Sequence, residues 1–335
     1  MPTTPARTTL GTTGPTTSAL GLGLMGMSDL YGPADEAESV ATVHAALDAG
    51  VTLLDTGDFY GMGHNELLLH EALRGRDRAS VEISVKFGAQ RGPDGSWLGY
   101  DASPAATRTA LAYSLRRLRT DYVDVYRPAR LDPNVPIEET VGAIAELVKA
   151  GYVRHIGLSE VGAETLRRAS AVHPISDLQI EYSLLSRSLE AEVLPAAREL
   201  GIGVTAYGVL SRGLLSGHWT GDREIPATDF RGFGPRFQGD NLSHNLRLVE
   251  ALRDVATAKG ATVAQVAIAW VASRGDDIVP LVGARRRDRL TEALGSLDVH
   301  LTPEDLAAVE AAVPEGSAAG DRYAAAQMAH LDSEH

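Results

Sequence analysis

The sequence predicts a single (β/α)₈ barrel of the TIM type, and three observations lead to this fold. Eight short apolar segments alternate with helix-like segments along the chain. This alternation indicates a parallel sheet, because parallel neighbours need a helical crossover between them. Polar and charged residues stand at the C-terminal ends of many segments, which is the edge where barrel enzymes keep their chemistry. No linker or change of composition marks a second domain.

The expected strands are short apolar runs, as buried parallel strands are. They cover residues 18–24, 51–55, 81–86, 122–126, 153–159, 177–183, 203–208 and 277–283. The expected helices carry apolar residues at helical spacing, and several end at a glycine. They cover residues 35–50, 64–74, 103–118, 137–151, 162–171, 190–200, 243–259, 262–273 and 287–296, with a further surface helix at 303–313.

A doubly wound open sheet is the alternative to a closed barrel. Two points weigh against it: no G-x-G-x-x-G opens a helix after an early strand, and the polar residues are spread over many strand ends. We therefore divide the chain into an N-terminal segment or hairpin (1–17), a barrel (18–313) and a C-terminal tail (314–335). The tail is rich in Ala and Gly, and we expect it to be partly mobile.

Composition narrows the function classes. The chain has 335 residues, 44% of them hydrophobic, enough for one large core or two modest ones. Its net charge of −13 argues against nucleic acid or an anionic membrane as the main partner. The absence of cysteine excludes thiolate catalysis and cysteine-based zinc sites. Without a signal peptide or an apolar span, a cytoplasmic protein acting on a small molecule is expected. The sequence carries no indication of oligomeric state.

Three residues at neighbouring strand ends form a candidate catalytic group. Asp55 ends the segment VTLLD, Tyr60 follows in a glycine-containing loop, and Lys86 ends the next apolar segment. A lysine partly desolvated at a barrel rim needs a partner, and Asp55 is a natural one. A cation beside Tyr60 would lower its pKa and favour proton donation to a carbonyl oxygen. The alternative is a structural ion pair with Tyr60 as a rim aromatic.

A run of arginines, VGARRRDR, follows the last expected strand. Barrels often hold a phosphate in the loops after strands seven and eight. Arg285, Arg286, Arg287 and Arg289 stand there, after the backbone amides of Gly283 and Ala284. Amides that open a helix and guanidinium groups both suit phosphate oxygens. The alternative is a solvated helix start.

Together these segments resemble the aldo-keto reductase family over residues 18–297. The similarity rests on LGLGLMGMS, LLDTGDFYGMGHNE, SVKFGA, DYVDVYRPARLDP, VRHIGLSE, QIEYSLLSR, VTAYGVLSRGLLSG and VPLVGARR, in this order. The resemblance implies a (β/α)₈ barrel that binds NADPH without a Rossmann domain and reduces aldehydes and ketones. It implies a tetrad of Asp, Tyr, Lys and His, of which Asp55, Tyr60 and Lys86 match the first three.

The fourth tetrad position departs from the family pattern. Where the family has His before Arg, the segment YRPARLD has Ala129. That His normally donates a hydrogen bond to the substrate carbonyl, and such a donor is worth about 10²–10³ in rate. Either the substrate brings a polar group, or His64 or Arg127 stands in, or turnover is impaired. With Met27, these residues form the expected substrate pocket, and the run ARLDPNVPIEET is reminiscent of pyridoxal reductases.

The resemblance also implies the cofactor positions. Ser159 and Gln179 would contact the nicotinamide carboxamide, and Tyr207 would stack on the nicotinamide ring. The pyrophosphate would lie along Leu210, Ser211 and Gly213, and the adenosine 2′-phosphate along Gly283, Ala284, Arg285 and Arg289. The arginines favour NADPH over NADH. Ala293 stands where the family often has an adenine-facing Asn.

Two other classes of function are weighed against a reductase. An NADPH-binding redox sensor or regulatory module would keep cofactor affinity and turn over poorly, because Ala129 replaces the His. A metal- or phosphate-using barrel enzyme would be built on Asp55, Asp58 and His64. Lys86 argues against a metal there, since its charge competes with a cation. No metal is therefore expected.

Overall fold

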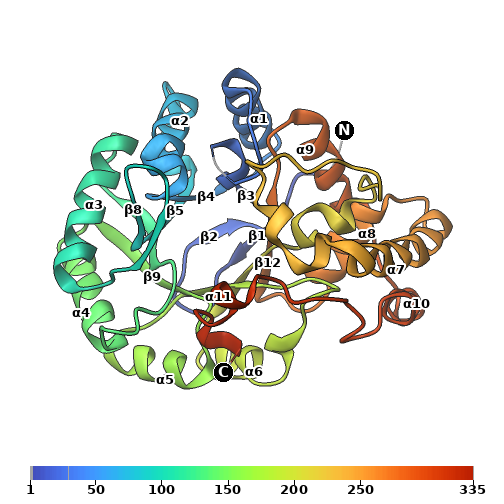
Figure 1. The fold of residues 1–335 in the computed structure, drawn as a ribbon. Helices are drawn as coiled ribbons and strands as arrows, with labels where there is room; N and C mark the ends of the chain where they lie inside the picture. The colour runs from blue at the N-terminus through green and yellow to red at the C-terminus, as the bar shows by residue number, and fades with distance from the viewer. Residues whose placement is uncertain (1–2, 29, 335) are drawn as a thin grey trace.

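The computed structural model describes residues 3–28 and 30–334. Within these residues, eight parallel strands close into a barrel whose strand order follows the chain, with β12 pairing back to β3 (Figure 1). They are β3 (Gly21–Gly23), β4 (Leu53–Gly57), β5 (Glu82–Phe87), β8 (Val123–Pro128), β9 (Val153–Ser159), β10 (Asp177–Glu181), β11 (Gly203–Tyr207) and β12 (Ile278–Gly283). Closure confirms the predicted fold and excludes the open sheet.

Helices surround the barrel, and each predicted helix is present with shifted ends (Figure 1). They are α1 (Glu36–Asp48), α2 (His64–Leu73), α3 (Pro104–Leu118), α4 (Ile137–Lys149), α5 (Ala163–Val172), α6 (Val193–Glu199), α7 (Gly239–Ala258), α8 (Val263–Ala272), α9 (Arg287–Leu294) and α10 (Pro303–Ala312). In the described residues no single helix is long and apolar enough to cross a membrane. Helices α7 and α8 pass that test of length and composition only as a pair, bent by 86°.

Two antiparallel hairpins flank the barrel. The predicted N-terminal hairpin pairs β1 (Arg7–Thr9) with β2 (Thr16–Ser18). Its Leu10 is buried against the barrel residues Leu53 and Val279. The second hairpin, β6 (Ala89–Arg91) and β7 (Trp97–Tyr100), was not predicted. Its signal was the turn sequence GPDG between two short segments, and the segments themselves carry too few apolar residues to predict strands.

The C-terminal tail is held against the barrel, which differs from the prediction of a partly mobile segment. Short helix α11 (Ala325–Met328) lies in front of the barrel in Figure 1. Arg322 is 7% exposed and makes ion pairs to Glu160 and Glu181, which follow β9 and end β10. Leu331 is buried, and the Asp332 carboxylate accepts a hydrogen bond from the Gly162 amide. The tail therefore contributes side chains to the C-terminal rim.

Candidate active site

Asp55 and Lys86 form the predicted ion pair. They lie on adjacent strands β4 and β5, and the Lys86 ammonium contacts the Asp55 carboxylate. The Ser84 hydroxyl and the Gln179 amide donate to Asp55 Oδ2 at 2.9 and 2.8 Å. Both charges are buried, at 2% and 5% exposure. Burial lowers the pKa of Lys86 to about 8, although Asp55 opposes this shift.

Tyr60 lies beside this pair and keeps a free hydroxyl. It starts a 3₁₀ segment (Tyr60–Gly63) that two residues separate from the end of β4, and there the backbone turns through left-handed conformations at Gly61 and Met62. Lys86 Nζ is 5.2 Å from the ring centroid. Among the described residues the phenol oxygen has no hydrogen-bond partner within the protein. It is therefore available to a bound molecule.

The predicted lowering of the Tyr60 pKa is not what the structure shows. Burial raises the pKa well above 10.0, and the Asp55 carboxylate raises it further. The Arg130 cation acts in the opposite direction but does not reverse this increase. A phenol with a raised pKa stays protonated at neutral pH, so Tyr60 is present as the phenol, which can donate a proton, rather than as the phenolate.

A cavity of about 810 Å³ opens above these residues at the C-terminal ends of the strands. Most predicted site residues line it together. They are Met27, Asp55, Tyr60, Lys86, Ser159, Gln179, Tyr207, Leu210, Gly213, Gly283, Ala284, Arg285 and Arg289. The topology brings them to one rim because parallel strands of a barrel all end on the same face.

Four predicted residues do not line this cavity. Ser211 is buried, and its hydroxyl shares a 2.9 Å hydrogen bond with Ser183. Ala129 is 3% exposed within the wall. Arg127 is fully buried with Asp177 at 2.6 Å, because its side chain on β8 turns into the barrel interior. His64 contacts the Ser28 hydroxyl at 2.9 Å outside the cavity. Placing Ala129, Arg127 and His64 in the substrate pocket was therefore wrong, and neither His64 nor Arg127 replaces the tetrad histidine.

The cavity is also lined by residues that were not among the predicted site residues. Arg130 follows Ala129 and points into the cavity instead of Arg127. Trp97 and Tyr100 come from the unpredicted hairpin, and Tyr323 comes from the tail. The position of Arg130 just after β8 could have indicated its place in the cavity. The sequence carries no such indication for Tyr323, because its position depends on contacts between distant parts of the chain.

The nicotinamide end of the predicted cofactor site has the donors and acceptors that a carboxamide needs. The Ser159 hydroxyl is buried and has no hydrogen-bond partner among the described residues. Gln179 lies beside it, with one amide hydrogen on Asp55 and its carbonyl oxygen open to the cavity. A buried unpaired hydroxyl is costly unless a ligand pairs with it. These residues fit an amide group.

The opposite end of the cavity is strongly basic. Arg223, Arg231, Arg285, Arg286 and Arg289 all line it. Burial lowers the pKa of Arg285, and the nearby Arg231 cation lowers it further. Such crowding of like charges is relieved by a bound anion. Nothing lies within 4 Å of a Cβ built on Gly283, so the backbone there is open to a ligand. This end fits a phosphate group.

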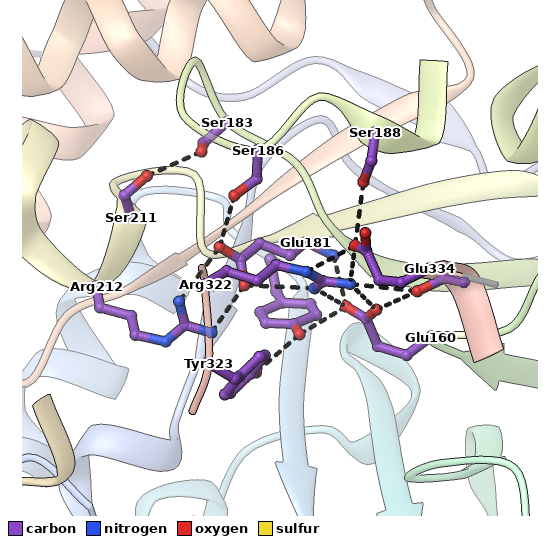
Figure 2. Close-up of polar contacts among 12 residues, drawn as sticks. Glu160, Glu181, Ser183, Ser186, Ser188, Ser211, Arg212, Arg322, Tyr323 and Glu334 are labelled. Atoms are coloured by element: carbon purple, nitrogen blue, oxygen red, sulfur yellow. Dashed lines mark hydrogen bonds and ion pairs between the residues drawn. The ribbon is translucent and has the colours of Figure 1, made fainter. Parts of the chain in front are cut away.

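A polar network joins the tail to the middle of the cavity rim (Figure 2). Arg322 donates to both oxygens of Glu160, at 2.8 and 2.6 Å, and the Tyr207 hydroxyl donates to Glu160 Oε1 at 2.6 Å. Burial alone would raise the pKa of Glu160, but Arg322 holds it well below its usual range. Arg212 forms a 2.7 Å ion pair with Glu181 on the next strand. Both carboxylates are thereby neutralised.

The metal alternative is not supported by the positions of its proposed ligands. Asp55 is paired with Lys86, and His64 contacts Ser28. In the described part of the chain, no group of three or more His, Asp or Glu side chains is placed to hold a metal ion. Asp58 instead faces Glu66 and Arg117.

Asp58 gives a testable pH dependence of stability. Burial raises its pKa from 3.8 to about 7, and the Glu66 charge adds to this. A carboxyl whose folded pKa is raised costs stability as pH rises from its unfolded pKa to its folded pKa. Asp58→Asn is therefore expected to raise the melting temperature at about pH 8 and to leave it unchanged near pH 3 to 4. Thermal unfolding at both pH values tests this, and an equal change at both would contradict it.

Comparison with known proteins identifies the family of this chain. The family model described as "Aldo/keto reductase family" matches residues 19–314. A probable aldo-keto reductase 1 from Glycine max is 41% identical over 317 residues, covering 94% of this chain and 90% of that protein. The glycerol dehydrogenase AKR11B4 from Gluconobacter oxydans superposes with a TM-score of 0.83 at 29% identity, covering 91% of this chain and 94% of that one. The holo form of the aldo-keto reductase AKR11C1 from Bacillus halodurans superposes with a TM-score of 0.75 at 27% identity, covering 92% of this chain and 96% of that one.

The fold and site define an oxidoreductase built on a (β/α)₈ barrel. The chain belongs to the aldo/keto reductase family, whose members interconvert carbonyl compounds and alcohols.

Proposed function

We propose that this protein reduces an aldehyde or ketone to the alcohol with NADPH, and that Tyr60 donates the proton. The observation that carries the proposal is the free phenol of Tyr60, which lines the same cavity as the buried Asp55–Lys86 pair. NADPH supplies the hydride when it is bound. Ser159 and Gln179 hold its carboxamide, Tyr207 packs on the ring, and Arg285 and Arg289 hold the phosphate of the adenosine.

The role of each catalytic residue follows from charge and burial. The raised pKa keeps the Tyr60 proton in place until a carbonyl oxygen gains negative charge. Lys86 places a cation next to that developing charge, and Asp55 fixes the position of Lys86. The basic end of the cavity follows β12, across the barrel from Arg130 after β8. The substrate would therefore occupy the end near Arg130, which Trp97 and Tyr100 also line. We further propose a cytoplasmic enzyme whose partner is a small carbonyl compound, with neither nucleic acid nor membrane as a partner.

An assay of NADPH oxidation with a panel of aldehydes and ketones, including pyridoxal, tests the proposal. Glycerol with NADP⁺ tests the reverse direction, prompted by the glycerol dehydrogenase among the structural relatives. Turnover of at least one carbonyl is expected. Tight NADPH binding with no turnover of any substrate would overturn the enzymatic function. It would support a redox-sensing module instead, a reading favoured by the absence of a hydrogen-bond donor at Ala129.

The preference for NADPH over NADH can be tested at Arg289. Its side chain lines the basic end of the cavity, with 43% of its surface exposed. Arg289→Ala is expected to weaken NADPH binding by about 10- to 100-fold, the loss of one charge-assisted hydrogen bond, and to leave NADH binding unchanged. Dissociation constants for both cofactors measure this.

Arg287→Ala is the matched control for this test. Arg287 begins the same helix, α9, but pairs with Glu38 at 2.8 Å and does not line the cavity. Its removal is expected to affect neither cofactor. If Arg289→Ala weakens both cofactors equally, Arg289 does not contact the phosphate that distinguishes them.

A further inference from the structure

Arg130 is a cation at the substrate end of the cavity, and no carboxylate of the described residues contacts it. Its Nη1 donates to the Ala129 carbonyl at 2.6 Å, and its Nη2 contacts the Tyr323 hydroxyl at 3.5 Å. Within the described residues, no Asp or Glu oxygen lies within 4.0 Å of its guanidinium. A guanidinium group has five N–H donors, so most of the donors of Arg130 are open to the cavity.

Three arginines near this cavity, with side chains exposed by 6% or less, are paired. Arg127 has Asp177 at 2.6 Å, Arg212 has Glu181 at 2.7 Å, and Arg322 has Glu160 at 2.6 Å. Each of these carboxylates is in contact with its own arginine, and none of them contacts Arg130. Glu160 is the carboxylate whose charge acts on Arg130, and it also accepts hydrogen bonds from the hydroxyls of Tyr207 and Ser333.

A partly buried charge that no carboxylate contacts is costly, so such a site in a binding cavity is explained by a ligand that carries an opposite charge. The phosphates of the proposed cofactor do not supply it. Their expected position is beside Gly283 and Arg285, after β12. Arg130 follows β8, which lies four strands from β12 in either direction around the barrel.

The surroundings of Arg130 define the rest of the ligand. The Arg130 charge acts on both Tyr60 and Lys86, so the guanidinium faces the same chamber as the proton donor. Trp97 and Tyr100 line this end of the cavity. Phe59 also lines it, in edge contact with Trp97 at 5.9 Å between ring centroids. Aromatic walls favour an apolar or planar body between the anionic group and the carbonyl.

We propose that Arg130 binds an anionic group of the substrate, so that the preferred substrates are carbonyl compounds bearing a carboxylate or a phosphate. This rests on the proposed function, because it names the substrate class of the same site. It also bears on the missing histidine. Ala129 does not line the cavity, whereas the next residue, Arg130, does and would hold the substrate by its anionic group.

Three aldehydes of matched shape test the proposal. They are 4-carboxybenzaldehyde, its neutral methyl ester and 4-formylphenyl phosphate. With the wild-type protein, at least one of the two anions is expected to give a kcat/KM about 10- to 100-fold above the ester, mainly through KM. Which anion is preferred distinguishes a carboxylate from a phosphate ligand. Arg130→Met should abolish the preference, Arg130→Lys should restore part of it, and the affinity for NADPH should stay constant in both.

A binding measurement separates this proposal from the proposed function. Binding of 4-(hydroxymethyl)benzoate and of its methyl ester is measured without turnover by the quenching of tryptophan fluorescence. Trp97, which lines the cavity, contributes to this signal. Tighter binding of the acid that disappears in Arg130→Met supports the anion site even if no aldehyde is reduced. Equal binding of acid and ester, or a preference that survives in Arg130→Met, overturns it. Arg116→Met, at an exposed position on α3, is the control.

Discussion

Replacing Tyr60 by Phe is expected to lower kcat for carbonyl reduction by about 10²–10⁴-fold, the usual contribution of a positioned general acid. The ring and its packing against Phe59, at 4.7 Å between ring centroids, are retained, so the fold and the cavity shape should persist. The lost atom is the phenol oxygen, which has no hydrogen-bond partner among the described residues. Steady-state kinetics with the best carbonyl substrate, together with NADPH titration, separates loss of chemistry from loss of binding.

Tyr113→Phe is the control for the Tyr60 variant. Tyr113 lies on α3 and is 57% exposed, so removing its hydroxyl should change neither rate nor affinity. The prediction fails if Tyr60→Phe keeps wild-type activity, which would assign the proton to another donor. An unchanged kcat with weakened NADPH binding would also count against it, because Tyr60 would then be a binding residue.

The Asp55–Lys86 pair could be predicted from the sequence because the two residues lie on strands that are consecutive in the barrel. Both residues belong to apolar segments that become adjacent strands, and parallel strands end at the same rim. The positions of both residues near the ends of these strands therefore indicated that their side chains would meet at the rim. The same reasoning failed for the pKa of Tyr60. That value depends on how fully the ring is desolvated, and burial of one side chain is set by the whole structure.

The error at Arg127 has a different cause. Successive side chains on a strand point to opposite faces, so a shift of a residue or two decides whether a side chain faces the interior or the rim. Strand β8 continues to Pro128, two residues beyond its predicted end, and Arg127 is therefore still inside the barrel with Asp177. Arg130 lies past the strand and reaches the cavity.

The tail could not be placed from the sequence, because its polar composition resembles that of a mobile end. Arg322 fixes it through ion pairs with Glu160 and Glu181, which are 162 and 141 residues earlier in the chain. No periodicity or spacing connects positions so far apart. The two glutamates themselves gave a signal, since carboxylates on or just after apolar strands need cationic partners.

Replacing Arg322 by Met is expected to destabilise the protein by about 3–5 kcal/mol at neutral pH, because it leaves buried carboxylates without a counter-charge. Glu160 and Glu181 are each 2% exposed or less, and Arg322 contacts both. Arg168→Met is the matched control. Its two-bond ion pair with Glu138, at 2.8 Å, lies on an exposed surface, with side chains 46% and 41% exposed, and its loss should change the stability far less. Urea unfolding of both variants measures the difference.

The pH dependence of this loss identifies its electrostatic origin. Arg322 holds the pKa of Glu160 well below the ordinary value of 4.5, and a depressed carboxyl pKa adds stability above the unfolded pKa. That stability is lost as pH falls below 4.5 toward the folded pKa. The gap between wild type and Arg322→Met should therefore be widest at neutral pH and shrink below about pH 4. A gap that stays constant with pH would show that Arg322 acts through packing alone, and that the tail is held by contacts other than its buried ion pairs.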